Sequence, residues 1–267
     1  MQKKIKNRIR ISKAEKLKRV VIFILSSLLV LVVVFNVNTF SRLFNMYNYD
    51  RYLNSLYKLK QSKGLSALAE INSSTFAYIE CEDLNMHLPV VETKNTTEED
   101  FYINHDFRKQ ANELGCPYQK SSTKLGETTV STLVGHSAFT NTIFNIKKDQ
   151  SIFGKLNQYL YRSTAYNYKI TVETFTDLYT FKVVGVMRFN VKNGSGADEM
   201  SVYSTVNISS QSQFDSFYQK IQNKSVIGIV ETPHYGDTFL TLFTCSTSDL
   251  DYRVMVVAKQ VSKVSVA

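Results

Sequence analysis

From about residue 75 to the C-terminus, short strand-like runs of largely apolar residues follow one another, separated by short gaps. The runs are rich in Val, Ile, Thr, Tyr and Phe, which favour the pleated, half-buried surface of a strand. Their number and the short gaps between them predict a mostly β fold of about eight strands, either a barrel or a sandwich. The expected strands are 76–80, 88–91, 128–134, 168–175, 178–189, 226–230, 238–244 and 252–261.

Three segments of the chain are expected to be helical instead. The strongest case is 210–224, where Ser210 can cap the helix. Four apolar residues then follow at positions i, i+3, i+4 and i+7: Phe214, Phe217, Tyr218 and Ile221. A second, short helix is expected at 152–161. Apolar residues in 41–70 recur every three to four positions, so this segment is also expected to be helical, either as a spacer or packed on the domain.

An uncharged apolar run spans residues 20–37. At about 1.5 Å per residue, a helix of this length covers roughly 27 Å, close to the apolar thickness of a bilayer. The run is longer than a typical signal-peptide core, and no small-residue cleavage site follows it. The pattern therefore predicts an uncleaved signal anchor over residues 20–38, with a cleaved signal peptide as the alternative.

The positive charge of the chain is concentrated at the N-terminus. The first 19 residues hold nine Lys/Arg and one acid, Glu15, which gives +8 of the net +9. The rest is close to neutral, which argues against a nucleic-acid-binding domain. The positive-inside rule places the N-terminus in the cytoplasm and residues from about 41 outside. The expected parts are a cytoplasmic tail (1–19), the transmembrane anchor (20–38), a helical spacer (39–72) and an extracellular domain (73–267).

The chain has three cysteines, Cys81, Cys116 and Cys245. An odd number in an exported domain leaves at least one thiol free, and Cys81 and Cys116 pair only if their strands meet. The sequence has no Cys-x-x-Cys pair, no His/Cys cluster at zinc spacing and no Gly-rich phosphate loop. We therefore expect no metal and no nucleotide cofactor.

Cys245 ends the run 238–244, and Arg253 begins the next expected strand. The linking segment 246–251 is short and polar, as in a hairpin. Antiparallel pairing would place both residues at one end of neighbouring strands, about 4.8 Å apart. The arginine charge would then favour the thiolate and hold a developing oxyanion. The alternative is a buried structural thiol beside a surface arginine.

A cysteine nucleophile also needs a proton acceptor. The candidates are His87, His105, His136 and His234. His136 is favoured because it follows the apolar run 129–135, which ends in glycine and would place it at a strand tip. The other three remain open, and each can instead be a solvated or packing histidine. All four precede Cys245, whereas papain-like peptidases place the cysteine first.

Taken together, Gly135-His136, the Thr-Leu-Phe-Thr-Cys segment 241–245 and Arg253 resemble a sortase, and most closely class B. The Leu-Pro-Val-Val segment at 88–91 and the segment 101–107 support the resemblance. So do the helices expected before the barrel and before the cysteine strand. The resemblance covers roughly residues 45–262. Class B chains usually have Ser where this one has Phe243, and the segments 115–119 and 134–138 also depart from the usual pattern.

This resemblance implies a closed β-barrel and a cysteine transpeptidase on the surface of a Gram-positive cell. Cys245 would be the nucleophile, His136 the general acid and base, and Arg253 the oxyanion stabiliser. Substrate contacts would come from Phe243, Thr244 and Ser246. The partners would be surface proteins with a C-terminal sorting signal and an amine of peptidoglycan, lipid II or a pilin. The alternatives are a surface cysteine peptidase that does not transfer, or an inactive β binding domain.

Overall fold

The computed structural model describes residues 13–93, 98–137, 152–245 and 251–266. The chain divides into two compact units, Met1–Asn48 and Tyr49–Ala267. The first contains the N-terminal part of helix α1 (Lys13–Lys63), and the second contains the sheet and all other elements.

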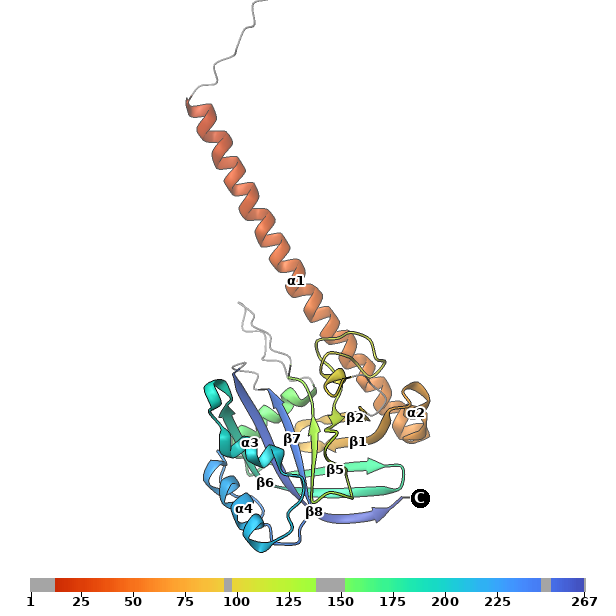
Figure 1. Ribbon diagram of the computed structural model, residues 1–267. Helices are drawn as coiled ribbons and strands as arrows, with labels where there is room; N and C mark the ends of the chain where they lie inside the picture. The colour runs from red at the N-terminus through yellow and green to blue at the C-terminus, as the bar shows by residue number, and fades with distance from the viewer. Residues whose placement is uncertain (1–12, 94–97, 138–151, 246–250, 267) are drawn as a thin grey trace, which may run out of the picture. The chain divides into compact units, whose positions relative to one another are not determined.

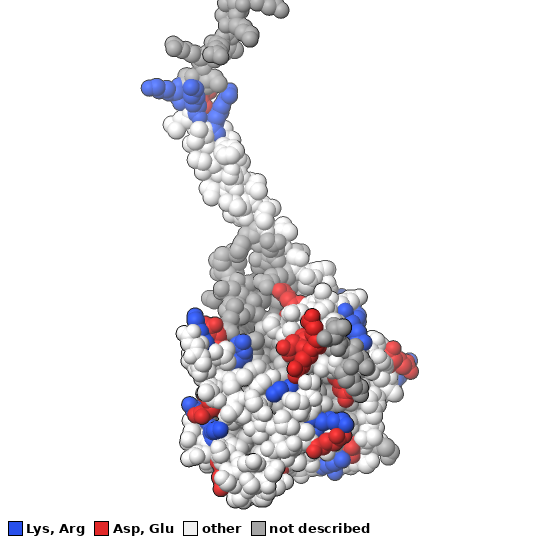
Figure 2. Space-filling model, in the orientation of Figure 1, with Lys and Arg blue, Asp and Glu red and all other residues white. Residues whose placement is uncertain are grey.

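In the first unit, α1 is uncharged for most of its length. Lys13–Val34 is long and apolar enough to cross a membrane, with a mean hydropathy of 2.6 over its most apolar stretch and none of that stretch buried. Figure 2 shows Lys and Arg at the N-terminal end of this helix and an uncharged surface beyond them. Length and composition therefore make it a candidate membrane span, as expected for the apolar run.

The second unit is a closed barrel with strand order β1-β2-β3-β4-β7-β8-β6-β5 (Figure 1). The pairs β2–β3 and β4–β7 are parallel, and the remaining neighbours are antiparallel. The expected closed β-barrel with a few helices is confirmed. Its strands within the described residues are β1 (Thr75–Cys81), β2 (Met86–Glu92), β3 (Tyr118–Gln119), β4 (Val130–Val134), β5 (Lys169–Thr174), β6 (Asp177–Asn190), β7 (Phe239–Cys245) and β8 (Tyr252–Ser265).

Two strand predictions differ from the structure. The expected strand at 226–230 is wrong: this segment curls, because Gly228 is left-handed (φ 71°) and its carbonyl accepts a hydrogen bond from the hydroxyl of Ser225 at 2.6 Å. Only Val226 and Val230 donate backbone hydrogen bonds to β6. Conversely, β3 was not predicted, because two residues are too few to show an alternation.

The helix at 210–224 is confirmed as α4 (Gln211–Lys224), with the hydroxyl of Ser210 accepting from the Gln213 N–H. Its apolar face packs on β6, β7 and β8 through Phe214, Phe217 and Ile221. The helix expected at 152–161 forms as a 3₁₀ helix. The other helices are α2 (Ser66–Ile71), α3 (Ala197–Ser204), η1 (Glu82–Leu84), η2 (Phe101–Ile103), η3 (Ile152–Leu160) and η4 (Lys192–Gly194).

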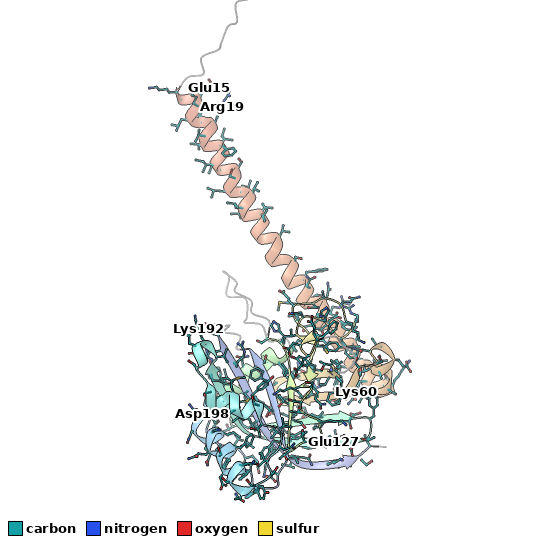
Figure 3. All side chains as sticks on the ribbon, viewed as in Figure 1. Glu15, Arg19, Lys60, Glu127, Lys192 and Asp198 are labelled. Atoms are coloured by element: carbon teal, nitrogen blue, oxygen red, sulfur yellow. The ribbon has the colours of Figure 1, made fainter. Side chains whose placement is uncertain are left out.

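From Tyr49 onward, α1 packs on the barrel, which settles one alternative left open by the sequence. Tyr49, Leu53 and Leu56 are buried. Lys60, labelled in Figure 3, lies near the C-terminal end of this helix. Its Nζ is 2.9 Å from Glu80 Oε1 and 2.6 Å from Glu173 Oε2, so it joins α1 to β1 and β5. Burial lowers the pKa of Lys60, but the hydrogen bonds to these two carboxylates outweigh it and raise the pKa overall.

Replacing Lys60 with Met is expected to destabilise the protein by about 1–2 kcal/mol, because Glu80 and Glu173 would face each other without their shared cation. Thermal unfolding of the full chain in detergent would measure this. The matched control is Lys58→Met, which changes an exposed lysine on the same helix. Equal midpoints for the two variants would show that the Lys60 ion pairs do not hold the helix to the barrel.

Candidate active site

The residues predicted to react lie at one end of three adjacent strands. In the antiparallel β7–β8 pair, Cys245 is opposite Arg253. In the parallel β4–β7 pair, Val134 is opposite Phe243, and His136 follows Val134 by two residues, as Cys245 follows Phe243. The register therefore brings His136, Cys245 and Arg253 to the same level in the order β4, β7, β8.

Gly135 connects β4 to His136 and has a specific reason to be glycine. Its N–H donates to the carbonyl of Phe243 at 3.1 Å, which carries the β4–β7 pairing to within one residue of His136. A Cβ at this position would lie 2.6 Å from the ring of Phe153 in η3. The missing side chain lets η3 pack directly on the backbone that positions His136.

Below this level, an apolar cluster covers one face of the strands. Phe239 of β7 and Met255 and Val257 of β8 are buried in it beneath α4. Thr241 is opposite Val257 and Phe243 is opposite Met255, so these positions of the two strands share one face. Phe243 is half-buried at the top of the cluster, 4.3 Å from Tyr203 between ring centroids.

His136 is half-buried, and two opposite charges act on its imidazole. Burial lowers the pKa of the imidazole, the carboxylate of Glu113 raises it, and the guanidinium of Arg253 lowers it, with a net lowering. At neutral pH the ring is therefore mainly uncharged. Its buried Nδ1 has no hydrogen-bond partner among the residues that the structure describes.

Arg253 is half-buried at the start of β8, and several contacts hold the residues around it. Its Nη1 donates to the Tyr252 carbonyl at 3.1 Å. The guanidinium of Arg188 lies 3.9 Å from the Tyr252 ring centroid, and the Asp251 carbonyl accepts from the Val191 N–H. These contacts tie the first residues of β8 to β6 and the segment after it.

The other two cysteines are free and buried, so they are not paired. The Cys81 Sγ lies 2.9 Å from the Tyr159 hydroxyl. Burial raises the pKa of Cys81 to about 11 and that of Cys116 well above its usual value. Thiols in such surroundings stay protonated and are poor nucleophiles. Reaction as a nucleophile is therefore not expected of Cys81 or Cys116.

The remaining histidine candidates have other contacts. His87 on β2 packs on Tyr57 and lies 3.4 Å from Glu80. His105 stacks on Phe101, with ring centroids 3.9 Å apart. His234 lies in a turn, where its N–H donates to Asp237. Of the four histidines, His136 is the one that the strand register brings level with Cys245.

The three predicted substrate-binding residues have different surroundings. Phe243 lies two residues before Cys245 on β7 and is half-buried. Thr244 is almost fully buried, and its hydroxyl has no partner among the described residues. Ser246 lies outside the described residues. Within the described residues there is also no group of three or more His, Cys, Asp or Glu that could hold a metal ion.

The chain matches a known protein family over most of its length. The family model described as the sortase domain matches residues 79–261, more than half of the chain. The chain belongs to the sortase family. No curated protein matches its sequence significantly.

Solved sortase B structures share the fold of this sortase. One from Bacillus anthracis has a TM-score of 0.66 at 21% identity, with 82% of this chain and 99% of that chain covered. A Staphylococcus aureus sortase B–substrate complex has a TM-score of 0.62 at 20% identity (83% and 95% covered). A sortase B complexed with triglycine has a TM-score of 0.61 at 22% identity (83% and 97%). The predicted resemblance to class B is thus confirmed at the level of the fold.

The sequence analysis did not single out Glu113, whose negative charge raises the pKa of His136 in this sortase. Glu113 belongs to no motif and lies in a polar segment, 23 residues before His136 in the chain. The antiparallel pairing of β3 with β4 directs the segment before Tyr118, which contains Glu113, past the end of β4, and β3 itself was not predicted.

Replacing Arg253 with Gln is expected to raise the pKa of His136, because a positive charge that disfavours the imidazolium is removed. Arg253→Lys, which keeps the charge, should leave it nearly unchanged. NMR titration of labelled histidine side chains in the full chain measures both. A pKa of His136 that shifts equally in the two variants, or in neither, would contradict an electrostatic coupling to residue 253.

Proposed function

We propose that this sortase is a membrane-anchored cysteine transpeptidase. It cleaves a C-terminal sorting signal after Thr through a thioacyl-enzyme and joins the new carboxyl end to an amine of peptidoglycan, lipid II or a pilin. The observation that carries the proposal is the register of β4, β7 and β8, which brings His136, Cys245 and Arg253 to one level.

The first half of the reaction forms the acyl-enzyme. The Cys245 thiolate attacks the Thr carbonyl carbon, and a C–S bond forms as the carbonyl becomes an oxyanion. The protonated His136 then gives its proton to the leaving nitrogen, and the C–N bond breaks. Since the pKa of His136 is lowered, its imidazolium is a comparatively strong acid and transfers this proton readily.

Arg253 has two roles in this scheme. Its permanent charge favours the thiolate of Cys245, which is its partner across the β7–β8 pair. It also stabilises the oxyanion that forms at the carbonyl. Phe243, Thr244 and Ser246 are the proposed substrate contacts from the cysteine strand and the residue after it.

The partners in this proposal are a protein with a sorting signal and an amine acceptor. The likeness in fold to a sortase B–substrate complex and to a sortase B complexed with triglycine supports both kinds of partner. The candidate span Lys13–Val34 would hold the enzyme in the membrane, with the N-terminus in the cytoplasm and the barrel outside. An enzyme and substrates confined to one surface meet at a raised effective concentration.

A cysteine peptidase that hydrolyses without transfer is the second candidate, because it uses the same three residues and the same acyl-enzyme. The two differ only in what attacks the thioacyl group. Capture of an added amine in the product identifies the transferase, whereas release of a free carboxylate alone identifies the peptidase.

Replacing Cys245 with Ala is expected to lower turnover of sorting-motif peptides by about a thousandfold or more, because the nucleophile is removed. The assay uses the full chain in detergent, a panel of fluorogenic sorting-motif peptides, and an amine acceptor that is either present or absent. Cys81→Ala is the matched control, since it removes a buried thiol on β1 and should keep activity. Peptide cleavage at an unchanged rate in Cys245→Ala would contradict the proposal.

The rate should follow a bell-shaped pH profile, because one proton is shared between His136 and Cys245 in the active form. Arg253→Gln should move both limbs to higher pH, since loss of a positive charge makes both groups hold their protons more tightly. Arg253→Lys should keep the limbs in place. A flat profile for the wild type between about pH 6 and 9 would count against the pair.

A further inference from the structure

Lys120 is a half-buried lysine directly after β3. Its N–H donates to the Thr132 carbonyl at 2.9 Å, so the pairing of β3 with β4 continues to this residue. Its side chain reaches α3, where Nζ lies 4.1 Å from the centroid of the Tyr203 ring and donates to the Tyr203 carbonyl at 3.4 Å. These contacts hold the ammonium at a defined place beside α3.

Both groups that hold this ammonium are uncharged. A ring face and one long hydrogen bond use only part of the capacity of its three N–H donors. Within the part of the chain that the structure describes, Lys120 forms no ion pair. The nearby carboxylate of Glu99 acts on Lys120 electrostatically, while Glu99 Oε1 accepts from the Ser121 hydroxyl at 2.8 Å.

Burial has cost this cation more hydration than the protein replaces. Burial lowers the pKa of Lys120, the charge of Glu99 raises it, and the net effect is a lowering. A carboxylate that arrived from outside would restore the missing charge partner and use the open N–H donors. Lys120 is therefore suited to bind an anionic group of a ligand.

The ring of Tyr203 connects Lys120 to the cysteine strand. It also packs on Phe243 of β7, with ring centroids 4.3 Å apart and 37° between the ring planes. Phe243 is opposite Val134 on β4, and Val134 is opposite Tyr118 on β3, two residues before Lys120. Lys120, Tyr203 and Phe243 thus form a row that extends from β3 to β7, which we call the cation–aromatic row.

This row ends close to the proposed nucleophile. Phe243 is two residues before Cys245 on β7, and positions two apart on a strand are on the same face. Only β4 lies between β3 and β7 in the sheet. Two interstrand spacings amount to roughly 10 Å, and an extended peptide covers about 3.3 Å per residue. A peptide whose Thr carbonyl is at Cys245 would therefore reach Lys120 within about three residues.

We infer that Lys120 is a specificity residue for the sorting signal: its ammonium binds the carboxylate of an Asp or Glu among the three residues before the Thr. Tyr203 and Phe243 form the surface over which these residues lie. Arg253, on the other side of β7, is left to stabilise the oxyanion. This inference rests on the proposed transpeptidase function.

The residues before the Thr are the part of the substrate that gains most from such a contact. They stay joined to Cys245 through the thioacyl bond until transfer, whereas the residues after the Thr leave in the first half of the reaction. An ion pair to the retained part would position the thioacyl group in both halves. Lys120 makes and breaks no bond itself.

The test uses peptide pairs that are identical except for Glu or Gln at one of the three positions before the Thr. With the full chain in detergent, the Glu peptide of one pair should have a kcat/KM about tenfold higher than the Gln peptide, because only the carboxylate forms a charge-assisted hydrogen bond. Lys120→Met keeps a long side chain without the charge and should reduce this ratio to within about twofold. Lys120→Arg keeps the charge and should keep a preference for Glu.

Two further variants test the charge directly. Lys120→Glu should reverse the preference, so that a peptide with Lys at the sensitive position is turned over faster than one with Glu. Lys124→Met is the matched control, because it removes an exposed lysine of the same segment that already pairs with Glu127. It should leave the ratio of Glu to Gln peptide at the wild-type value.

Binding of the same peptides to Cys245→Ala, measured by fluorescence anisotropy, separates this inference from the proposed function, since it needs no turnover. With Lys120 present, the Glu peptide should bind with a Kd about tenfold lower than the Gln peptide, and Lys120→Met should abolish the difference. A preference for Glu in binding without any Cys245-dependent turnover of wild type would overturn the proposed function and leave the peptide site standing.

Other outcomes would overturn the inference itself. One is equal binding and turnover of the Glu and Gln peptides at all three positions. Another is a preference for Glu that persists in Lys120→Met, whatever the change in rate, since Lys120 would then only support α3. A preference for Glu confined to positions after the Thr would assign the ammonium to the leaving part of the substrate.

Discussion

The parallel pairing of β4 with β7 is the constraint on which the rest of the site depends. Its partners are far apart in the chain: Val130 lies opposite Phe239, 109 residues later. This pairing joins the two halves of the barrel and fixes the level of His136 against Cys245. Parallel strands need a long connection, and here that connection contains β5, β6, α3 and α4. The helices that cover the apolar face are thus part of the link that makes the pairing possible.

The residues of the candidate site differ in how many long-range contacts position them. β7 and β8 are adjacent in the chain, so the relation of Cys245 to Arg253 is local and robust. His136 depends on Gly135, on the Phe153 ring packed against it, and on the last β4–β7 hydrogen bond. Glu113 depends on β3, which is only two residues long, and on the hydroxyl of Tyr49. Residues on strands farther from β7 in the sheet are positioned by contacts between segments that are farther apart in the chain.

The sequence predicts those elements whose determining residues lie close together in the chain. The Ser210 cap and the spacing of Phe214, Phe217 and Ile221 are local, and α4 forms where they predict it. The short polar segment 246–251, which predicts antiparallel pairing of its two flanking strands, is also a local signal, and Cys245 does lie opposite Arg253. The run 226–230 has strand-like residues, but the left-handed Gly228 and the Ser225 hydroxyl override that propensity. Glu113 was missed because its relation to His136 arises only from the pairing of β3 with β4, which leaves no periodic signal in the chain.

The two buried thiols bear on how the protein would respond to an oxidising medium. Cys81 and Cys116 are inaccessible and protonated in the folded barrel, so oxidants in the surroundings have little to react with. The fold itself is their protection, without any disulfide between them. Unfolding would expose these thiols to mixed disulfides and wrong pairs in an oxidising medium. Where that oxidation outpaces refolding, the lifetime of the protein is set by its rate of unfolding and not by its equilibrium stability.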